Sequence, residues 1–168
     1  ELDGIQAETI LFLSKLEELK IELPNKKIIV KKDRQEAQED IVDLTISRDD
    51  SEDLVKKYWL HEKQLEVPKE ITINEESRKE VNKRNVLIAF PLNEDNNPEK
   101  KYFAWFEIKK EPSGFPFLIH SDFLLTASRE TFRESDWNNW LYNELPSVIC
   151  NGLCVLSENK KYREKLYG

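Results

Sequence analysis

The chain has 168 residues, which suits a single domain, and its hydrophobic fraction of 39% can build a core despite a charged fraction of 35%. Its formal net charge is -7, so it is a poor electrostatic partner for nucleic acid, whose phosphates need clustered lysine and arginine. No apolar run reaches the length of a transmembrane helix, and the first residues carry no signal-peptide pattern, so we expect no membrane partner.

The first half of the chain predicts helices and several short strands. Residues 4–20 carry apolar side chains near the helical period after a cap pair, Asp3 and Gln6, so we expect an amphipathic helix that ends before Pro24. Asn74 is placed to cap a short polar helix that runs to Asn82. Strands are predicted at residues 28–30, 42–46, 58–60 and 65–67, with an acidic turn at 49–53.

The second half carries clearer strand patterns. Residues 86–92 form a nearly continuous apolar run, turn residues occupy 93–100, and residues 102–108 alternate in side-chain direction. Two such runs around a polar turn predict a β-hairpin. A third strand is expected at residues 115–120, after the Pro-Ser-Gly sequence of residues 112–114, which interrupts regular structure.

The last part of the chain predicts helices. Residues 128–132 look like a helix start, and Ser135 precedes a second helix in which Trp137, Trp140 and Leu141 recur at helical spacing. We expect Pro146 to kink or restart that helix before its basic end at residues 160–165.

Two cysteines, Cys150 and Cys154, are the only ones in the sequence. Their spacing of four places both on one face of this helix, and we expect that face to be buried rather than to carry a disulfide. So few cysteines favour a cytoplasmic location. Methionine is absent, even from position 1, which favours a fragment of a larger protein.

These elements predict an α+β domain: a mixed sheet with helices packed mainly on one face. We treat residues 1–168 as one domain with two stretches. Residues 1–83 hold the N-terminal helix and variable strands, and residues 84–168 hold the hairpin, the third strand, a Ser-Arg-Glu turn and the C-terminal helices. The aromatic residues at strand and helix spacing are expected in the core rather than on a client-binding surface; they are Trp105, Phe115, Phe117, Phe123, Trp137 and Trp140.

The most informative stretch runs from Gly114 to Glu130 and reads Gly-Phe-Pro-Phe-Leu-Ile-His-Ser-Asp-Phe-Leu-Leu-Thr-Ala-Ser-Arg-Glu. With the Trp-Asn-Asn-Trp-Leu sequence of residues 137–141, it resembles the region behind the ATPase domain in sacsin and related plant and bacterial proteins. Those proteins carry a Gly-x-Pro-Phe strand, an Ala-Asp-Phe-Leu-Leu step, Ser-Arg-Glu and then Trp-Asn. Residues 11–16 and 86–92 are similar to the same family, whereas the likeness is weakest between residues 31 and 83.

The tripeptide of residues 128–130 is also similar to the Ser-Arg-Glu of the middle domain in heat-shock-90 chaperones. That resemblance implies a fold like the second domain of ribosomal protein S5, and it implies that Arg129 reaches the γ-phosphate of ATP. A planar, permanently charged guanidinium suits a phosphate oxygen. Where those chaperones have an assisting glutamine, this sequence has Arg133, which we treat as an auxiliary cation. Asp122 either orients Arg129 or is an exposed turn residue, and we favour the turn.

The same tripeptide has a purely structural interpretation. Arg129 in the first turn of a helix can pair with an acidic neighbour, for which Glu130, Glu134 and Asp136 are the candidates. Ser128 is a good N-cap in either interpretation. The sequence leaves both interpretations of Arg129 open.

A nuclease motif is the third possibility. Glu107-Ile108-Lys109 follows an apolar strand and resembles the Glu-x-Lys strand of metal-dependent nucleases, which need a second carboxylate on a neighbouring strand. The nearest upstream aspartate, Asp95, falls in a turn. His61 and His120 have no metal-type spacing to each other or to the cysteines, so we expect no metal site.

No glycine-rich phosphate loop occurs, so ATP and Mg²⁺ belong to the parent protein and we expect no cofactor and no activity for this chain alone. We expect the chain to be the coupling domain of a sacsin-like or heat-shock-90-like (GHKL) ATPase. It would dock on an upstream ATPase domain, present Arg129 to the γ-phosphate and relay the nucleotide state, in a chaperone-like role with a protein client. The alternatives are a non-catalytic protein-interaction module and a metal-dependent nuclease-like domain.

Overall fold

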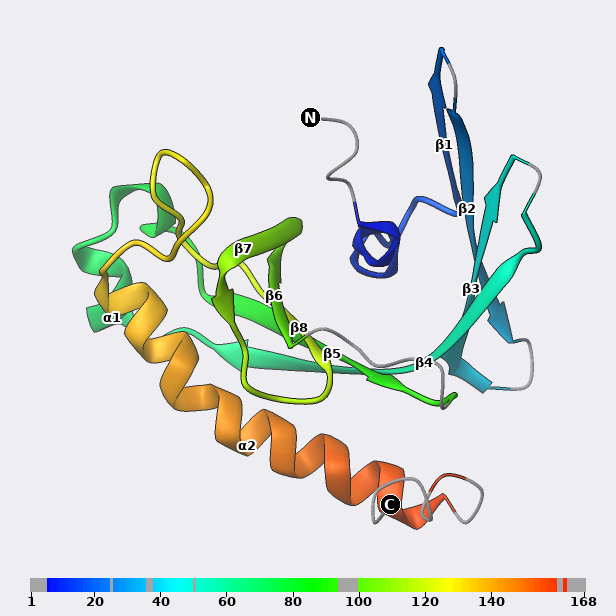
Figure 1. Cartoon of the computed structure of the whole chain (residues 1–168). Helices are drawn as coiled ribbons and strands as arrows, with labels where there is room; N and C mark the ends of the chain where they lie inside the picture. The colour runs from blue at the N-terminus through cyan, green and yellow to red at the C-terminus, as the bar shows by residue number, and fades with distance from the viewer. Residues whose placement is uncertain are drawn as a thin grey trace.

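The computed structural model describes residues 6–24, 26–35, 38–49, 51–93, 100–159 and 162. They form an α+β fold in which an eight-stranded sheet is flanked by a long C-terminal helix (Figure 1). The strand order is β1-β2-β3-β4-β5-β8-β6-β7, and every neighbouring pair is antiparallel except β6 with β8. The predicted α+β class with a mixed sheet is therefore confirmed.

The strands are β1 (Glu18–Leu23), β2 (Lys26–Gln35), β3 (Gln38–Arg48), β4 (Leu54–Glu66), β5 (Lys83–Pro91), β6 (Lys101–Ala104), β7 (Phe106–Pro112) and β8 (Leu118–His120). The helices are α1 (Lys69–Ile73), α2 (Asp136–Glu158) and the short 3-10 helices η2 (Ala7–Phe12) and η3 (Glu76–Arg78). In Figure 1, α2 runs along one face of the sheet and η2 lies on the other side.

Strands β1 to β5 follow one another in space as they do in the chain. The strands predicted at residues 28–30 and 42–46 are confirmed, within β2 and β3. The two short strands predicted at 58–60 and 65–67 belong mostly to one long strand, β4, which pairs with β5 over nine positions from Tyr58↔Pro91 to Glu66↔Lys83. This pairing joins the first half of the chain to the second in one sheet.

The predicted hairpin of residues 86–92 with 102–108 is wrong. Strand β8 pairs with β5 and lies between it and β6, so the two predicted partners never meet. The run 102–108 is itself divided at Trp105, whose positive φ of 68° turns the chain so that Ala104 pairs with Phe106. The predicted third strand is shorter than expected, because only Leu118–His120 is paired. Side-chain alternation identifies a strand but says nothing about which strand lies next to it.

The predicted helix over residues 4–20 is also wrong. The described part of that stretch is η2, a turn and β1, while Asp3 lies outside the described residues. Of the apolar residues whose spacing predicted the helix, Ile10 lies in η2 and Leu19 in β1, so the spacing runs across two different elements. The buried Lys32 fixes the end of η2, because its Nζ donates hydrogen bonds to the carbonyl oxygens of Ile10 (3.2 Å) and Leu13 (2.6 Å).

The polar helix predicted from Asn74 to Asn82 does not form either. Asn74 ends α1 at its C-cap position, and only the short η3 follows among residues 75–82. In contrast, the helix predicted after Ser135 is confirmed, since the Ser135 side chain accepts a hydrogen bond from the backbone N–H of Asn138 and caps α2. Pro146 does not restart the helix, because α2 runs without interruption through it.

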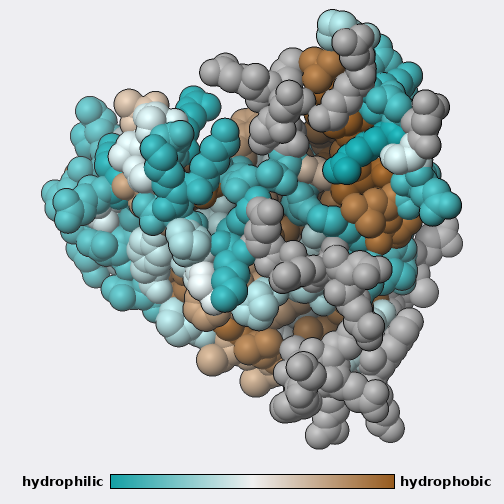
Figure 2. Space-filling model, viewed as in Figure 1, coloured by the Kyte–Doolittle hydropathy of each residue, from teal (hydrophilic) through white to brown (hydrophobic). Residues whose placement is uncertain are grey.

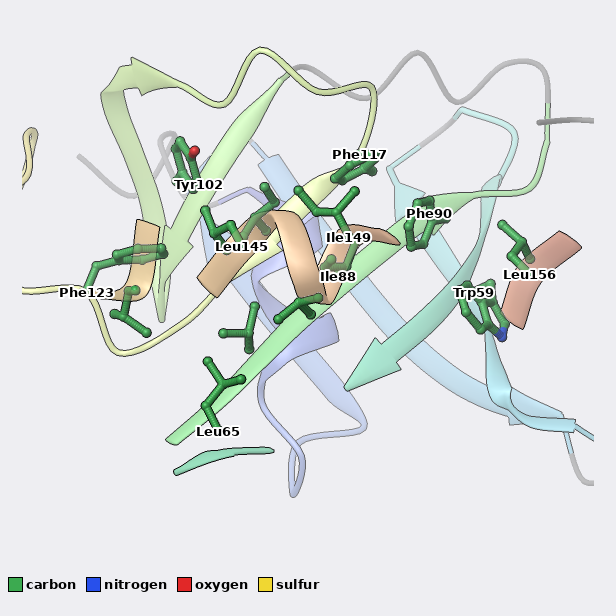
Figure 3. Packing of buried hydrophobic residues seen from close by; sticks show 14 of the residues in the cluster. Trp59, Leu65, Ile88, Phe90, Tyr102, Phe117, Phe123, Leu145, Ile149 and Leu156 are labelled. Atoms are coloured by element: carbon green, nitrogen blue, oxygen red, sulfur yellow. The ribbon is translucent and has the colours of Figure 1, made fainter. Parts of the chain in front are cut away.

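Two clusters of buried apolar residues form the core, one on each face of the sheet. The larger cluster fills the space between α2 and strands β4 and β5, where Leu145 and Ile149 of the helix face Ile88 and Phe90 (Figure 3). The smaller cluster packs η2 against β2, β3 and β4. Four of the six aromatic residues expected in the core are buried as predicted: Phe117, Phe123, Trp137 and Trp140.

Other burial predictions are wrong. Trp105 is 53% exposed and Phe115 is also exposed, because both lie in turns beside their strands. Cys150 and Cys154 are exposed and unpaired. A spacing of four fixes a shared helix face but does not say whether that face points inward, and here it points away from the sheet. Figure 2 shows hydrophobic residues along part of α2 and on the inner side of the β1–β3 end, whereas the α1 end is mainly hydrophilic.

No helix among the described residues is long and apolar enough to cross a membrane.

Candidate functional site

The connection between β8 and α2, residues 121–135, carries the Ser-Arg-Glu sequence at its tip. Its two sides approach each other at the isolated bridge between Leu125 and Phe132. Above the bridge, the Thr126 N–H donates to the Thr131 carbonyl (3.0 Å), and the Arg129 N–H donates to the Thr126 carbonyl (2.9 Å). The tip is therefore a tight hydrogen-bonded turn, and the predicted helix start at residues 128–132 is wrong.

Arg129 occupies an unusual position in this turn. Its φ is 59°, in the left-handed region that costs a non-glycine residue about 1–2 kcal/mol. The residue is exposed, and its guanidinium has no ion pair or hydrogen bond with a described residue. Ser128 is not a helix cap; its hydroxyl lies 3.2 Å from the Thr126 hydroxyl instead. Arg129 is thus at the surface, as expected, but in a strained turn rather than in a first helical turn.

The charged neighbours of Arg129 are engaged elsewhere. Glu130 pairs with Lys110 of β7 (2.6 Å), and this hydrogen bond holds the pKa of the Glu130 carboxyl below its usual value. The Glu130 carbonyl also accepts a hydrogen bond from the Lys110 N–H (3.1 Å). Arg133 pairs with Glu75 at the α1 end of the molecule. The predicted structural pairing of Arg129 with its acidic neighbours is therefore not seen.

Asp122 lies at the base of the connection and contacts two arginines. Its Oδ1 accepts a hydrogen bond from Arg78 and its Oδ2 accepts one from Arg84, both at 2.7 Å. Both guanidinium groups also lie over the ring of Trp137, at 5.4 and 5.9 Å from its centroid. The interpretation of Asp122 as an exposed turn residue is wrong, because this half-buried carboxylate joins η3, β5 and the connection.

The first turn of α2 holds both sides of the connection. The fully buried Trp137 donates its indole N–H to the Asp122 carbonyl (2.8 Å). Asn138 is 2% exposed, and its amide oxygen accepts from the Leu124 N–H (2.9 Å). Its amide nitrogen donates to the carbonyls of Leu124 (2.8 Å) and Arg133 (2.7 Å). Asn138 thus clamps the two sides of the connection below the turn.

Asn138 is the residue that sequence reasoning missed. It stands inside the Trp-Asn-Asn-Trp-Leu motif, but only the tryptophans were assigned a role. A polar residue next to a helix cap and between two core tryptophans is a signal, since a buried amide needs hydrogen-bond partners close by.

The nuclease-like alternative depends on Glu107 and on a second carboxylate, for which Asp95 was the candidate. Glu107 forms an ion pair with Lys101 (2.8 Å), and Asp95 lies outside the described residues. Among the described residues, no three side chains of the metal-binding types come together. The nuclease-like alternative gains no support from this arrangement.

Comparisons with known proteins give one partial match. A segment of 41 residues, 24% of this chain, is 46% identical to Protein NO VEIN from Arabidopsis thaliana. The segment covers 2% of that protein, so the relative is far longer than this chain. No protein-family model matches the chain, and no solved structure matches it.

Proposed function

We propose that this chain is a coupling domain that presents Arg129 to the γ-phosphate of ATP held by an upstream ATPase domain. The observation that carries the proposal is an exposed guanidinium at the tip of a tight turn, with no ion pair to any residue that the structure describes. An arginine without a carboxylate partner can direct all its guanidinium N–H groups to phosphate oxygens. A strained backbone at an exposed charged residue favours a functional role over a purely structural one.

The base of the connection supports the same role. A group that stabilises charge in a transition state must be held in place before the reaction, because reorganisation would lower its effect. Asn138, Trp137 and Asp122 fix the connection through six side-chain hydrogen bonds to described residues outside the exposed tip. The arginine can then be presented by a rigid stem, while its own side chain remains accessible.

The proposed ATPase parent is inferred from the resemblance to sacsin-like and heat-shock-90-like proteins. The α+β fold is compatible with a domain like the heat-shock-90 middle domain, although the strand order was not predicted. The match to a segment of a far longer protein fits a domain within a larger chain. Two exposed, unpaired cysteines fit a reducing location such as the cytoplasm. ATP and Mg²⁺ would be held by the upstream domain, and Arg129 would supply one cation to the phosphate.

The test uses the full-length protein that contains this chain. Arg129→Ala should lower the rate of ATP turnover on the order of a thousandfold while changing ATP affinity little, because the contact strengthens as charge develops on the transferred group. Lys109→Ala is the matched control, since Lys109 is an exposed cation on β7 outside the turn. Arg129→Ala combined with Arg133→Ala checks whether Arg133 substitutes.

The isolated chain gives a second test. It should hydrolyse no ATP, and calorimetry with ATP and Mg²⁺ should detect weak binding at most, because the sequence has no phosphate loop. Micromolar ATP binding by this chain alone would contradict the proposal that the upstream domain binds ATP and this chain supplies Arg129.

A non-catalytic protein-interaction module is the second candidate. The observation that favours it is the pair of exposed aromatic residues Trp105 and Phe106 at the turn between β6 and β7. Exposed aromatic residues are enriched in protein interfaces. Full ATP turnover in the double arginine variant would make this function the first choice.

A further inference from the structure

A groove lies on the side of the sheet opposite the middle of α2, between η2 and the β6–β7 hairpin. It consists of two adjoining cavities of about 540 and 280 Å³, which share Asn85, Trp105 and His120. Figure 1 shows η2 and the β6–β7 hairpin on the same side of the sheet, with the groove strands β4, β5 and β8 beneath them. Arg129 lines neither cavity, so this site is separate from the proposed phosphate contact.

One end of the groove is cationic. Arg78, Lys83 and Arg84 line the larger cavity, where Asp122 is the only carboxylate among the lining residues. Asp122 already accepts from both arginines, and Lys83 pairs with Glu66 outside the cavity. Two guanidinium groups against one carboxylate leave an excess positive charge, which attracts an anionic group.

Two buried polar atoms beside this end have no partner. The Nε of Arg78 and the Nε2 of His120 are both buried without a hydrogen bond to any described residue. His120 is 8% exposed, and its ring is stacked on Phe12 at 4.9 Å. Burial lowers the pKa of His120 to about 4, so the ring is neutral at pH 7 and adds no charge. Unsatisfied buried polar groups are uncommon in proteins and indicate where a ligand or water belongs.

Trp105 forms the wall between the two ends. Its ring meets the edge of the His120 ring at 5.2 Å, yet more than half of the residue is exposed. Its positive φ of 68° would suit glycine or asparagine better, so the tryptophan is retained at a cost in backbone energy. A strained, half-exposed tryptophan beside a groove fits a role in contacting a ligand.

The other end of the groove is apolar at its floor. Leu11 and Phe12 of η2 meet Leu60 of β4 and Leu87 of β5 in the smaller cavity. The charged side chains there are mixed in sign, with Arg34 against Asp40 and Glu62, so this end does not attract an anion. The groove is thus cationic at one end and apolar at the other, with an aromatic wall between them.

We propose that this groove binds a short extended segment of a partner protein in which a carboxylate side chain stands next to an apolar one. The carboxylate lies against Arg84 and Arg78, and the apolar side chain packs on Trp105 and the leucine floor. Charge complementarity carries this choice of occupant, because the cationic end matches one acidic side chain rather than a polyanion. A nucleic acid would meet the acidic residues of the smaller cavity and a chain of net charge -7.

The test measures fluorescence anisotropy of labelled octapeptides with the 168-residue chain. Half of the peptides carry Glu followed by Leu or Phe, and each has a matched peptide with Gln in place of Glu. We expect the acidic peptides to bind and their Gln counterparts to bind about tenfold more weakly, since a charge-assisted hydrogen bond contributes about that factor.

Two variants place the binding in the groove. Trp105→Gly removes the ring and suits the positive φ, so it should keep the thermal midpoint of the chain and lose about tenfold in affinity. Arg84→Gln should lose a similar factor, whereas Lys109→Gln, an exposed cation on β7, should bind as the unaltered chain does.

Three results would overturn the proposal: no acidic peptide binds better than its Gln counterpart, Trp105→Gly and Arg84→Gln both bind normally, or orthophosphate occupies the groove while the peptides do not. The last result would assign the groove to a phosphorylated ligand instead. None of these measurements depends on ATP turnover, so they do not affect the proposed role of Arg129.

Discussion

The base and the tip of the connection between β8 and α2 differ in almost every physical property. At the base, Trp137 and Asn138 are buried and their polar atoms bind the backbone of the connection. At the tip, Ser128 and Arg129 are exposed, and Arg129 has a strained backbone and no ion pair with a described residue. The two regions are only a few residues apart in the sequence.

This difference separates residues that stabilise the fold from a residue whose side chain is accessible to a partner. The tryptophan and asparagine of the Trp-Asn-Asn-Trp-Leu stretch stabilise the fold, because removing either leaves buried groups without partners. In the Ser-Arg-Glu stretch, Glu130 pairs with Lys110, whereas the Arg129 side chain has no ion pair with a described residue and is available to a partner. The comparison predicts large stability effects at the base and small ones at the tip.

The largest effect is expected for Trp137→Ala. The side chain is fully buried, donates to Asp122 and lies under Arg78 and Arg84, so its loss should cost about 3–5 kcal/mol of unfolding free energy. Denaturant unfolding measures it. Trp105→Ala is the control at an exposed tryptophan and should change the free energy by less than about 1 kcal/mol. Equal effects of the two changes would mean that the buried Trp137 stabilises the fold no more than an exposed tryptophan does.

Asn138→Ala should have the next largest effect. It leaves the N–H of Leu124 and the carbonyl of Arg133 without their partner, which should cost about 3 kcal/mol in unfolding free energy. The Leu124 carbonyl still accepts a hydrogen bond from the Arg133 N–H (2.8 Å). The matched control is Asn139→Ala, because Asn139 is the exposed next residue of the same helix. If the two alanine variants unfold at the same denaturant concentration, Asn138 does not clamp the connection.

Acid should lower the unfolding free energy through His120, the last residue of β8. The pKa of His120 is lowered by burial from 6.5 to about 4, so the unfolded chain takes up the proton first as the pH falls. The contribution of the neutral His120 to the unfolding free energy is complete above about pH 6.5 and is lost between pH 6.5 and 4. It amounts to up to about 3 kcal/mol.

Unfolding free energy measured across this pH range tests it. His120→Phe should flatten the profile, although a slope from His61 should remain because burial also lowers the pKa of that histidine. An unchanged slope in His120→Phe would mean that His120 is not the group that titrates.

The sequence predicted local elements better than their arrangement. The α2 helix was expected because Ser135 is a good cap and the tryptophans recur at helical spacing, both of which are local properties. The insertion of β8 between β5 and β6 was not, because it depends on contacts between residues far apart in the chain. The split at Trp105 was missed for a different reason, since tryptophan is not a residue that signals a positive φ.

The candidate site shows the same limit. Arg129 was expected at the surface because a contact with the γ-phosphate requires that position, but its turn was mistaken for a helix because Ser128 resembles a cap. The role of Asp122 was missed because its partners, Arg78 and Arg84, come from η3 and β5, which are distant in sequence. The groove beside Trp105 could not be predicted, since it depends on strand order.

The smallest effect, and the sharpest test of the comparison, is expected for Arg129→Gly. Glycine adopts a φ of 59° without the penalty that arginine carries, so the unfolding free energy should rise by about 0.5–1 kcal/mol after part of the gain is offset in the unfolded chain. Arg129→Ala retains the penalty and should leave the stability unchanged within about 0.5 kcal/mol. Denaturant unfolding of the two variants side by side separates the backbone effect from the loss of the side chain. A fall in stability for both would mean that the guanidinium makes stabilising contacts within the chain, and Arg129 would then stabilise the fold as the base does, although it lies at the tip. A higher unfolding free energy for Arg129→Gly, together with lost ATP turnover in the full-length protein, would instead show that Arg129 serves function and lowers the stability of the fold.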